Sequence, residues 1–272
     1  MGTHLSNHHF ARIQGRRLAY RIAGRTDGSP VVLIHALASQ SGSWDKTAGA
    51  LAELGFLVVA PDLCGHGQSD WVNSYALADF ECDLVALLDE LHLDRVDLIG
   101  HSLGGHLALR IAAGAPRRVR RLVIEATPVP PRDEVDAANL MARRKGEWYR
   151  AFLTAGAWRI LRLALLRQFD LRSAGPVIRE LRSPMPSWWR GVDAIQSPCL
   201  LLASKDNGAI SERIGLLSDS LANSRTVFLG DGHHLHTKHL DAFLAEVLPF
   251  LAADPPLLAA SGRRQQPADI CS

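Results

Sequence analysis

A serine between two glycines is the first candidate for chemistry in this sequence. The stretch "DLIGHSLGGHLALRI", residues 97–111, places Ser102 between Gly100 and Gly104 in the pattern G-x-S-x-G. The residues before Ser102 read as a buried strand, and the apolar residues after it repeat at helical spacing. A serine on such a strand–turn–helix junction is a nucleophile elbow, in which the glycines permit a tight turn without clashes. We therefore predict a nucleophilic Ser102 rather than a bystander serine in a glycine-rich turn.

A serine hydroxyl is a weak nucleophile unless a base removes its proton. The segment "LGDGHHLHTKHLDAF", residues 229–243, follows a strand candidate and holds four histidines. His233 directly follows Gly232, and a glycine turn allows its imidazole to lean across the site, so we predict His233 as the base. His234 and His236 are predicted to be neighbours that pack or hydrogen-bond. The spacing of the cluster matches no recognised metal-ligand pattern, so no metal site is predicted.

The base in turn needs a carboxylate that fixes its tautomer. Asp206, in "LLASKDNGAI", follows a strand candidate and gives the chain order Ser, Asp, His that this topology uses. Glu125 ends the strand candidate "RLVIEA" and could also reach the histidine. We favour Asp206 as the acid and keep Glu125 as the alternative.

Strand-like and helical patterns alternate along the chain, which predicts an α/β fold built on a mostly parallel sheet. A hairpin is predicted for "FARIQGRRLAYRIAG", and a helix for the leucine-rich stripe between Leu77 and Leu91. The buried-strand candidates, which are continuous apolar runs, are residues 31–36, 56–62, 95–100, 121–126, 199–204 and 225–230.

The alternation is interrupted between Pro128 and Arg190 by an arginine-rich helical segment. We predict a core of residues 10–127 and 191–252, an inserted helical cap at 128–190, and a flexible tail at 253–272. From Arg132 to Arg190 there are 12 basic and 6 acidic side chains, which would suit an anionic substrate or merely keep amphipathic helices soluble. Trp188 and Trp189 are candidate substrate-binding residues of an apolar pocket.

Four ordered motifs resemble those of the α/β-hydrolase superfamily across residues 10 to 252. They are "HALASQSGSW", "PDLCGHGQSD", "GHSLGG" and "GDGHHLH". The resemblance implies an eight-stranded, mostly parallel sheet flanked by helices. It also implies an oxyanion hole made by the backbone N–H groups of Leu103 and Leu37. Some branches of the superfamily take the acid from the strand before the cap, where Glu125 lies.

Composition bounds the remaining possibilities. The 272 residues carry a formal net charge of +2, which does not indicate nucleic-acid binding. The four cysteines are far apart, as expected of reduced thiols in a cytoplasmic protein, and no secretion signal or membrane-spanning run is present. No dinucleotide fingerprint or Walker loop occurs, so no cofactor is predicted. We expect a cytoplasmic protein that acts on a small-molecule substrate, with no nucleic-acid or membrane partner.

Three functions are compatible with these residues. The first is a serine hydrolase of esters, thioesters or lactones that works through an acyl-enzyme. The second is a carbon–carbon bond hydrolase with the same fold and triad, acting on a dienoate-type ketone. The third is a non-catalytic ligand receptor that retains the fold. We favour the first, and a serine-reactive probe separates it from the third.

Overall fold

The computed structural model describes residues 4–143 and 162–253 of the chain. Eight strands form one sheet in the order β1-β2-β4-β3-β5-β6-β7-β8. The strands from β4 to β8 along this order are parallel, and β1 runs in the same direction, so β2 is the one strand of this sheet that runs antiparallel to its neighbours. Their bounds are β1 His9–Ile13, β2 Arg16–Gly24, β3 Pro30–Ile34, β4 Leu57–Pro61, β5 Val96–His101, β6 Val119–Glu125, β7 Cys199–Ala203 and β8 Ser224–Phe228. The predicted fold class is confirmed.

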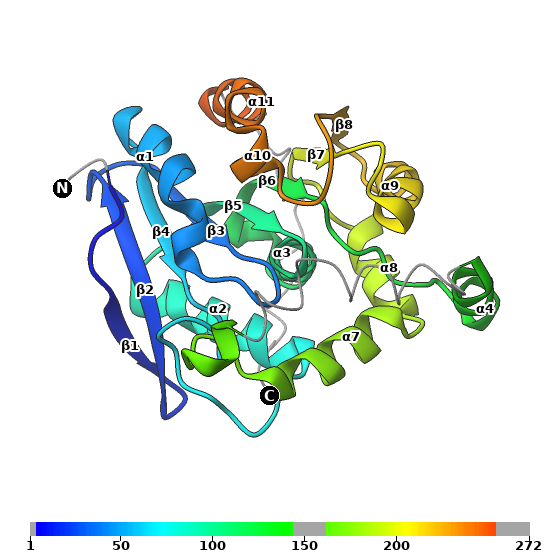
Figure 1. Cartoon of the computed structure of the whole chain (residues 1–272). Coiled ribbons are helices and arrows are strands. Elements are labelled where there is room, and N and C mark those ends of the chain that lie inside the picture. Colours follow the sequence, from blue (N-terminus) through cyan, green and yellow to red (C-terminus); the bar gives the residue numbers. More distant parts are fainter. Residues whose placement is uncertain (1–3, 144–161, 254–272) are drawn as a thin grey trace.

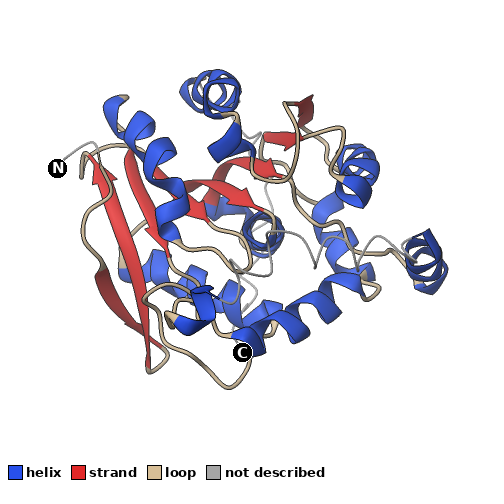
Figure 2. Ribbon diagram, viewed as in Figure 1, coloured by secondary structure: helices blue, strands red, loops and turns tan. Residues whose placement is uncertain are grey.

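Helices cover both faces of this sheet (Figure 2). In Figure 1, α1 and α11 lie on one face, and α2 and α3 lie on the other. The described helices are η1 Ser41–Trp44, α1 Asp45–Glu53, α2 Leu77–Glu90, α3 Leu103–Gly114, η2 Pro116–Arg118, α4 Glu134–Arg143, η3 Leu171–Ser173, α7 Ala174–Arg182, α8 Pro186–Asp193, α9 Gly208–Ser220, α10 Leu235–Lys238 and α11 Leu240–Ala252.

The strand sequences explain their places in the sheet. All six residues of β5 and all five of β7 are buried, as continuous apolar runs covered on both faces should be. Strand β8 has no fully buried residue, which suits its position at the edge. Strands β1 and β2 form the predicted hairpin, joined at Gln14 and Gly15 with φ of 50° and 82°. Positive φ at both turn residues matches the twist of a tight hairpin.

The predicted strands and helices therefore occur, with shifts of one or two residues at most ends. The largest differences, of two residues, are at β3, which ends at Ile34 rather than at residue 36, at β6, which begins at Val119 rather than Arg121, and at β8, which ends at Phe228 rather than at residue 230. Strand ends depend on pairing with a neighbour, which periodicity does not reveal. The helix predicted from the leucine stripe is α2, and α3 stops at Gly114.

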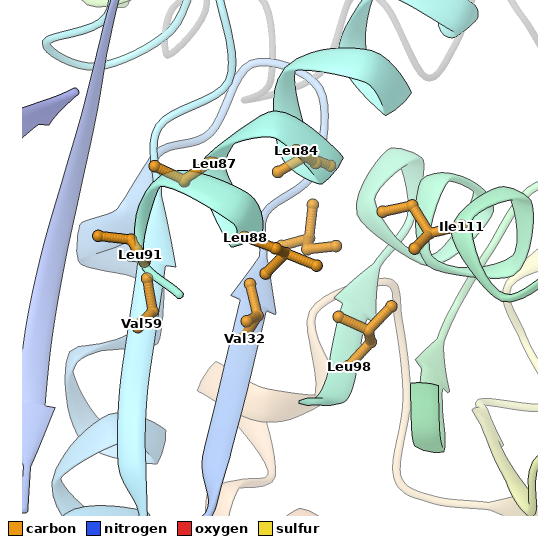
Figure 3. Close-up of a pocket in the computed structure, with 9 residues that line it drawn as sticks. Val32, Val59, Leu84, Leu87, Leu88, Leu91, Leu98 and Ile111 are labelled. Carbon is orange, nitrogen blue, oxygen red and sulfur yellow. The ribbon is translucent and has the colours of Figure 1, made fainter. Parts of the chain in front are cut away.

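The hydrophobic core lies in two layers, one on each face of the sheet. Trp44 and Phe243 anchor the layer beneath α1 and α11. On the other face, α2 and α3 pack on β3, β4 and β5, and Figure 3 shows the leucines of α2 directed toward this sheet. The small pocket between them is lined by nine aliphatic side chains and offers no polar group to a ligand. It belongs to the core rather than to a functional site.

The predicted cap segment is described in part, through α4, η3, α7 and α8. Residues 168–170 bind the loop after β4: Gly67 donates to the Gln168 carbonyl (2.9 Å), and Asp170 donates from its N–H to the Gly65 carbonyl (2.8 Å). Tyr75 adds a hydrogen bond from its hydroxyl to the Asp170 carboxylate (2.7 Å). Helix α8 packs on α3 within the core. The domain boundaries stay a prediction, and nearly all of the predicted tail lies outside the described residues.

None of the helices in the described ranges is long and apolar enough to cross a membrane.

Candidate active site

Ser102 lies at a sharp turn between β5 and α3. Its backbone has φ +52° and ψ −114°, a conformation that costs free energy for a residue with a side chain. Gly100 and Gly104 make the turn possible, because a Cβ on Gly100 would overlap the Gly104 carbonyl and one on Gly104 would overlap the Ile34 carbonyl. The strand–turn–helix context predicted for Ser102 is therefore present, and its side chain is half-buried.

Two backbone N–H groups near this turn are available to a ligand. Leu103 is the first residue of α3, so its N–H has no acceptor one turn earlier in the helix. In the described chain, neither the Leu103 N–H nor the Leu37 N–H donates a hydrogen bond to the protein. Leu37 itself packs against the core. These are the two donors that the sequence resemblance implied for an oxyanion hole.

The loop that carries Leu37 is held by two buried histidines. Ala38, with φ +54°, donates its N–H to Nε2 of His66 (3.2 Å). Nδ1 of His66 faces the Cys64 carbonyl (3.0 Å), so the proton lies on Nδ1. His35 accepts a hydrogen bond from the N–H of Leu63 (3.0 Å). Burial and the neighbouring His35 lower the pKa of His66 to about 3, which keeps it a neutral acceptor.

His233 lies in the turn between β8 and α10, next to the elbow. Its ring centroid is 4.8 Å from that of His101, whose Nε2 lies 2.7 Å from the His233 carbonyl. Burial lowers the pKa of His233 to about 4, with a smaller contribution from His236. The imidazole is therefore neutral at physiological pH, which is the state that a general base requires. No hydrogen bond joins it to the Ser102 hydroxyl among the described residues.

The acid predicted for the triad does not touch the His233 ring. The exposed carboxylate of Asp206 accepts a hydrogen bond from the N–H of Gly232 (2.8 Å), one residue before His233. This bond, with a further contribution from Ser204, lowers the pKa of Asp206. The atom facing Nδ1 of His233 is Nδ2 of Asn207, at 2.9 Å. Sequence reasoning missed Asn207, whose only signal was its position next to Asp206.

The alternative acid, Glu125, binds a different histidine. Its Oε2 lies 2.7 Å from Nδ1 of His236, and its Oε1 accepts the N–H groups of Leu235 (2.6 Å) and His236 (3.1 Å). Both side chains are fully buried. Glu125 therefore joins the histidine loop at His236 rather than at His233. His236 hydrogen-bonds and packs, as predicted for the neighbours of the base.

Trp188 and Trp189, the two candidate substrate-binding residues, lie on α8 and are nearly fully buried. The Trp188 ring stacks on His106 of α3, with centroids 5.1 Å apart. Trp189 donates from Nε1 to the Pro130 carbonyl (3.1 Å), and Arg132 lies over its ring. Trp188 thus packs α8 against α3, while Trp189 binds the segment of Pro130 and Arg132, and a role of either indole in binding substrate stays a prediction.

Groups of three or more His, Cys, Asp or Glu side chains that could hold a metal ion do not occur in residues 4–143 and 162–253.

Comparisons with known proteins agree with this architecture. A family model described as alpha/beta hydrolase fold matches residues 29–161. The crystal structure of a hydrolase from Pseudomonas aeruginosa superimposes with a TM-score of 0.74 at 26% identity, covering 91% of this chain and 99% of that one. The enol-lactonase from Burkholderia xenovorans LB400 gives 0.70 at 25% identity, covering 90% and 100%.

Matches to curated sequences are more local. The 2-hydroxy-6-oxo-2,4-heptadienoate hydrolase of Pseudomonas putida is 40% identical over 101 residues, which cover 36% of this chain and 37% of that protein. The chain spans less than half of the length of this and similar curated relatives.

Proposed function

The chain belongs to the α/β-hydrolase superfamily, and from this premise we propose that it is a serine hydrolase of small-molecule carboxylic esters, thioesters or lactones. The observation that carries the proposal is the backbone of Ser102, at φ +52° between β5 and α3. A strained conformation on a half-buried serine needs a functional reason, because an unstrained turn would serve packing equally well. Nucleophilic attack is such a reason.

Each step has a candidate group nearby. Ser102 Oγ attacks the substrate carbonyl carbon while Nε2 of His233 accepts the hydroxyl proton. The carbonyl oxygen becomes an oxyanion, which the N–H groups of Leu103 and Leu37 stabilise by about 3 kcal/mol each. His233 then gives the proton to the leaving group, and an acyl-enzyme remains. Water, deprotonated by His233, attacks the acyl carbon and releases the acid and free Ser102.

For His233 to act in this way, its ring proton must lie on Nδ1, and an acceptor must face that atom. We propose Asp206 as this acid, because its carboxylate is already bound to the N–H directly before His233. Asn207 is the neighbour that could supply an amide oxygen instead, by a half-turn of its side-chain amide. Glu125 is the weaker choice, since both of its oxygens are engaged by residues 235–236.

A second function has one specific observation in its favour. The 40% identical segment belongs to a protein named 2-hydroxy-6-oxo-2,4-heptadienoate hydrolase, after a dienoate-type ketone of the class that we expect for a carbon–carbon bond hydrolase. The same serine and histidine would then act on a dienoate-type ketone. We place this candidate second, because the solved structure at 25% identity that is similar over the whole fold is named an enol-lactonase, and a lactone is an ester.

The partners follow from this chemistry. We propose a small-molecule substrate, anionic or presented as a carrier thioester, because the segment from Arg132 to Arg190 is the most basic region of the chain. A cytoplasmic location and the absence of nucleic-acid and membrane partners complete the proposal. Wild-type protein should hydrolyse short p-nitrophenyl esters faster than ring-cleavage diketo acids. The opposite preference would favour the carbon–carbon hydrolase.

A further inference from the structure

We infer that Glu125 is a positioning residue that fixes the histidine loop against the nucleophile elbow, with His236 as its partner, and this inference rests on the proposed function. Glu125 is the last residue of β6 and pairs in register with His101, the residue before Ser102. Its backbone carbonyl accepts the N–H of Ser102 (2.8 Å). Its carboxylate accepts the N–H groups of Leu235 and His236. One residue therefore binds both the serine turn and the histidine loop.

Burial makes these bonds strong constraints. The side chains of Glu125 and His236 are both 0% exposed, so water cannot replace a lost partner. A buried carboxylate without donors costs several kcal/mol, and Glu125 meets this demand with three donors from residues 235–236. The loop cannot move away from β6 without breaking all three bonds at once.

The His236 ring is held from its other sides as well. It stacks on Trp44 with centroids 4.0 Å apart, and Phe243 packs at 6.2 Å. Its Nε2 is buried and has no hydrogen-bond partner within the described chain. A ring with an unpartnered Nε2 keeps its proton on Nδ1, where Glu125 accepts it. His236 therefore holds the loop in place through its bond to Glu125 and the packing of its ring.

A further hydrogen bond joins the loop to the residue directly before Ser102. The Nε2 atom of His101 lies 2.7 Å from the carbonyl oxygen of His233 and donates to it. The loop is thus fixed at the His233 carbonyl and at the N–H groups of Leu235 and His236. The first of these points lies at His233 itself and the other two lie two and three residues after it, and together they set the position of its imidazole relative to Ser102. Serine and base must be placed within a few tenths of an ångström for proton transfer, and errors near 1 Å can cost about 10²-fold in rate.

This role differs in its consequences from that of a triad acid. A triad acid fixes the tautomer of the base, so its amide variant loses about 10⁴ in turnover. A positioning residue shifts the base without changing its protonation. Glu125→Gln should therefore lower kcat by about 10- to 100-fold, with KM and the midpoint of the acid limb of the pH profile unchanged.

The test combines kinetics on p-nitrophenyl butyrate with amide hydrogen exchange of peptides covering residues 229–240, in Glu125→Gln and His236→Gln. Glu81→Gln is the matched control, because Glu81 is a buried carboxylate paired with Arg110, far along the chain from the loop. We expect faster amide exchange in the peptides of residues 229–240 for both Glu125→Gln and His236→Gln, with parallel losses of kcat. Glu81→Gln should behave like the wild type in both measurements.

Three results would overturn the inference. A loss of 10³ or more in Glu125→Gln, with a displaced acid limb, would make Glu125 the triad acid. Unchanged kcat per folded molecule, with lowered stability alone, would make the pair purely structural. Unchanged amide exchange of residues 229–240 in both variants would show that Glu125 and His236 do not hold the histidine loop. The exchange measurement needs no turnover. A wild-type protein that hydrolyses nothing would therefore refute the proposed function, and the exchange rates would still show whether Glu125 and His236 hold the loop.

Discussion

Nδ2 of Asn207 lies 2.9 Å from Nδ1 of His233, while the carboxylate of the preceding residue, Asp206, binds the N–H of Gly232. Asp206 and Asn207, which are adjacent in the chain, are thus both candidates for the partner of the His233 Nδ1 atom. A neutral amide can hold an imidazole in place, but only a carboxylate also stabilises the imidazolium that forms during proton transfer. The two assignments therefore predict different losses of turnover on substitution of Asp206 and Asn207, and these losses can be measured directly.

We expect Asp206→Asn to lose about 10⁴ in turnover, as amide replacement does in serine-protease triads, and Asn207→Ala to lose about 10-fold or less. Steady-state rates on one ester substrate, with thermal melting as the control for folding, give the comparison. If Asn207→Ala is the crippled variant and Asp206→Asn is nearly normal, the amide holds the base and our choice of acid is wrong.

The pH dependence of activity reports on His233. Burial lowers its pKa to about 4, so the neutral, active form persists well below the ordinary histidine value of about 6.5. With the amide of Asn207 facing Nδ1, as in this structure, the acid limb of kcat/KM would have its midpoint near pH 4. The proposed pairing with the Asp206 carboxylate raises the pKa of the ring, so we expect the midpoint above pH 4, with activity falling below it as the ring gains a proton. A midpoint near pH 4 would contradict the pairing with Asp206 and leave Asn207 as the partner of the base.

The three histidines of the loop should differ in their alanine variants. His233→Ala removes the base and is expected to lose 10³-fold or more, whereas His234→Ala should lose little. His236→Ala should fall between them, because it loses the Glu125 contact but not the base. Rates of each variant under saturating substrate establish the order. Loss of nearly all activity in His234→Ala would place our assignment one residue too early.

The chain should be sensitive to acid because of its buried histidines. Burial lowers the pKa of His101, His106 and His233, and His106 reaches about 3. The unfolded chain takes up protons below about pH 6.5 while these native rings do not, so folding stability is full above 6.5 and is lost as pH falls toward 4. Each such ring contributes about 1.4 kcal/mol per pH unit within this window.

Urea unfolding at pH 7, 6 and 5 measures this slope. The variant His106→Phe keeps an aromatic ring against Trp188 and removes one titrating group. It should therefore take up about one proton fewer on unfolding, so that its free energy of unfolding depends less steeply on pH. An identical slope in the variant and the wild type would show that His106 is protonated in the native state.

The sequence predicts the fold well because its signals are local. Continuous apolar runs gave β5 and β7, and the glycines around Ser102 gave the elbow. The partner of each carboxylate could not be predicted in the same way. Glu125 ends β6, and Asp206 lies three residues after the end of β7. Both carboxylates bind the histidine loop, Glu125 at residues 235–236 and Asp206 at Gly232, and a shift of a few residues along the loop decides which histidine each meets. Such distances depend on loop conformation, which no periodicity encodes.

The cap shows the same limit. The tryptophans of α8 suggested a pocket wall, but indole rings also satisfy packing against a neighbouring helix, and His106 supplies a partner that the sequence pattern did not single out. The Asn207 contact likewise arises from the turn that begins α9, where one residue more or less changes which side chain faces His233.

Covalent labelling with a fluorophosphonate, followed by peptide mapping, is the sharpest test of Ser102 as the nucleophile. We expect one adduct per chain, located on Ser102, in the wild-type protein, and no adduct in a folded Ser102→Ala variant, which should also lose nearly all esterase turnover. An unlabelled, folded wild-type protein, or an adduct that persists on another serine in Ser102→Ala, would contradict this assignment.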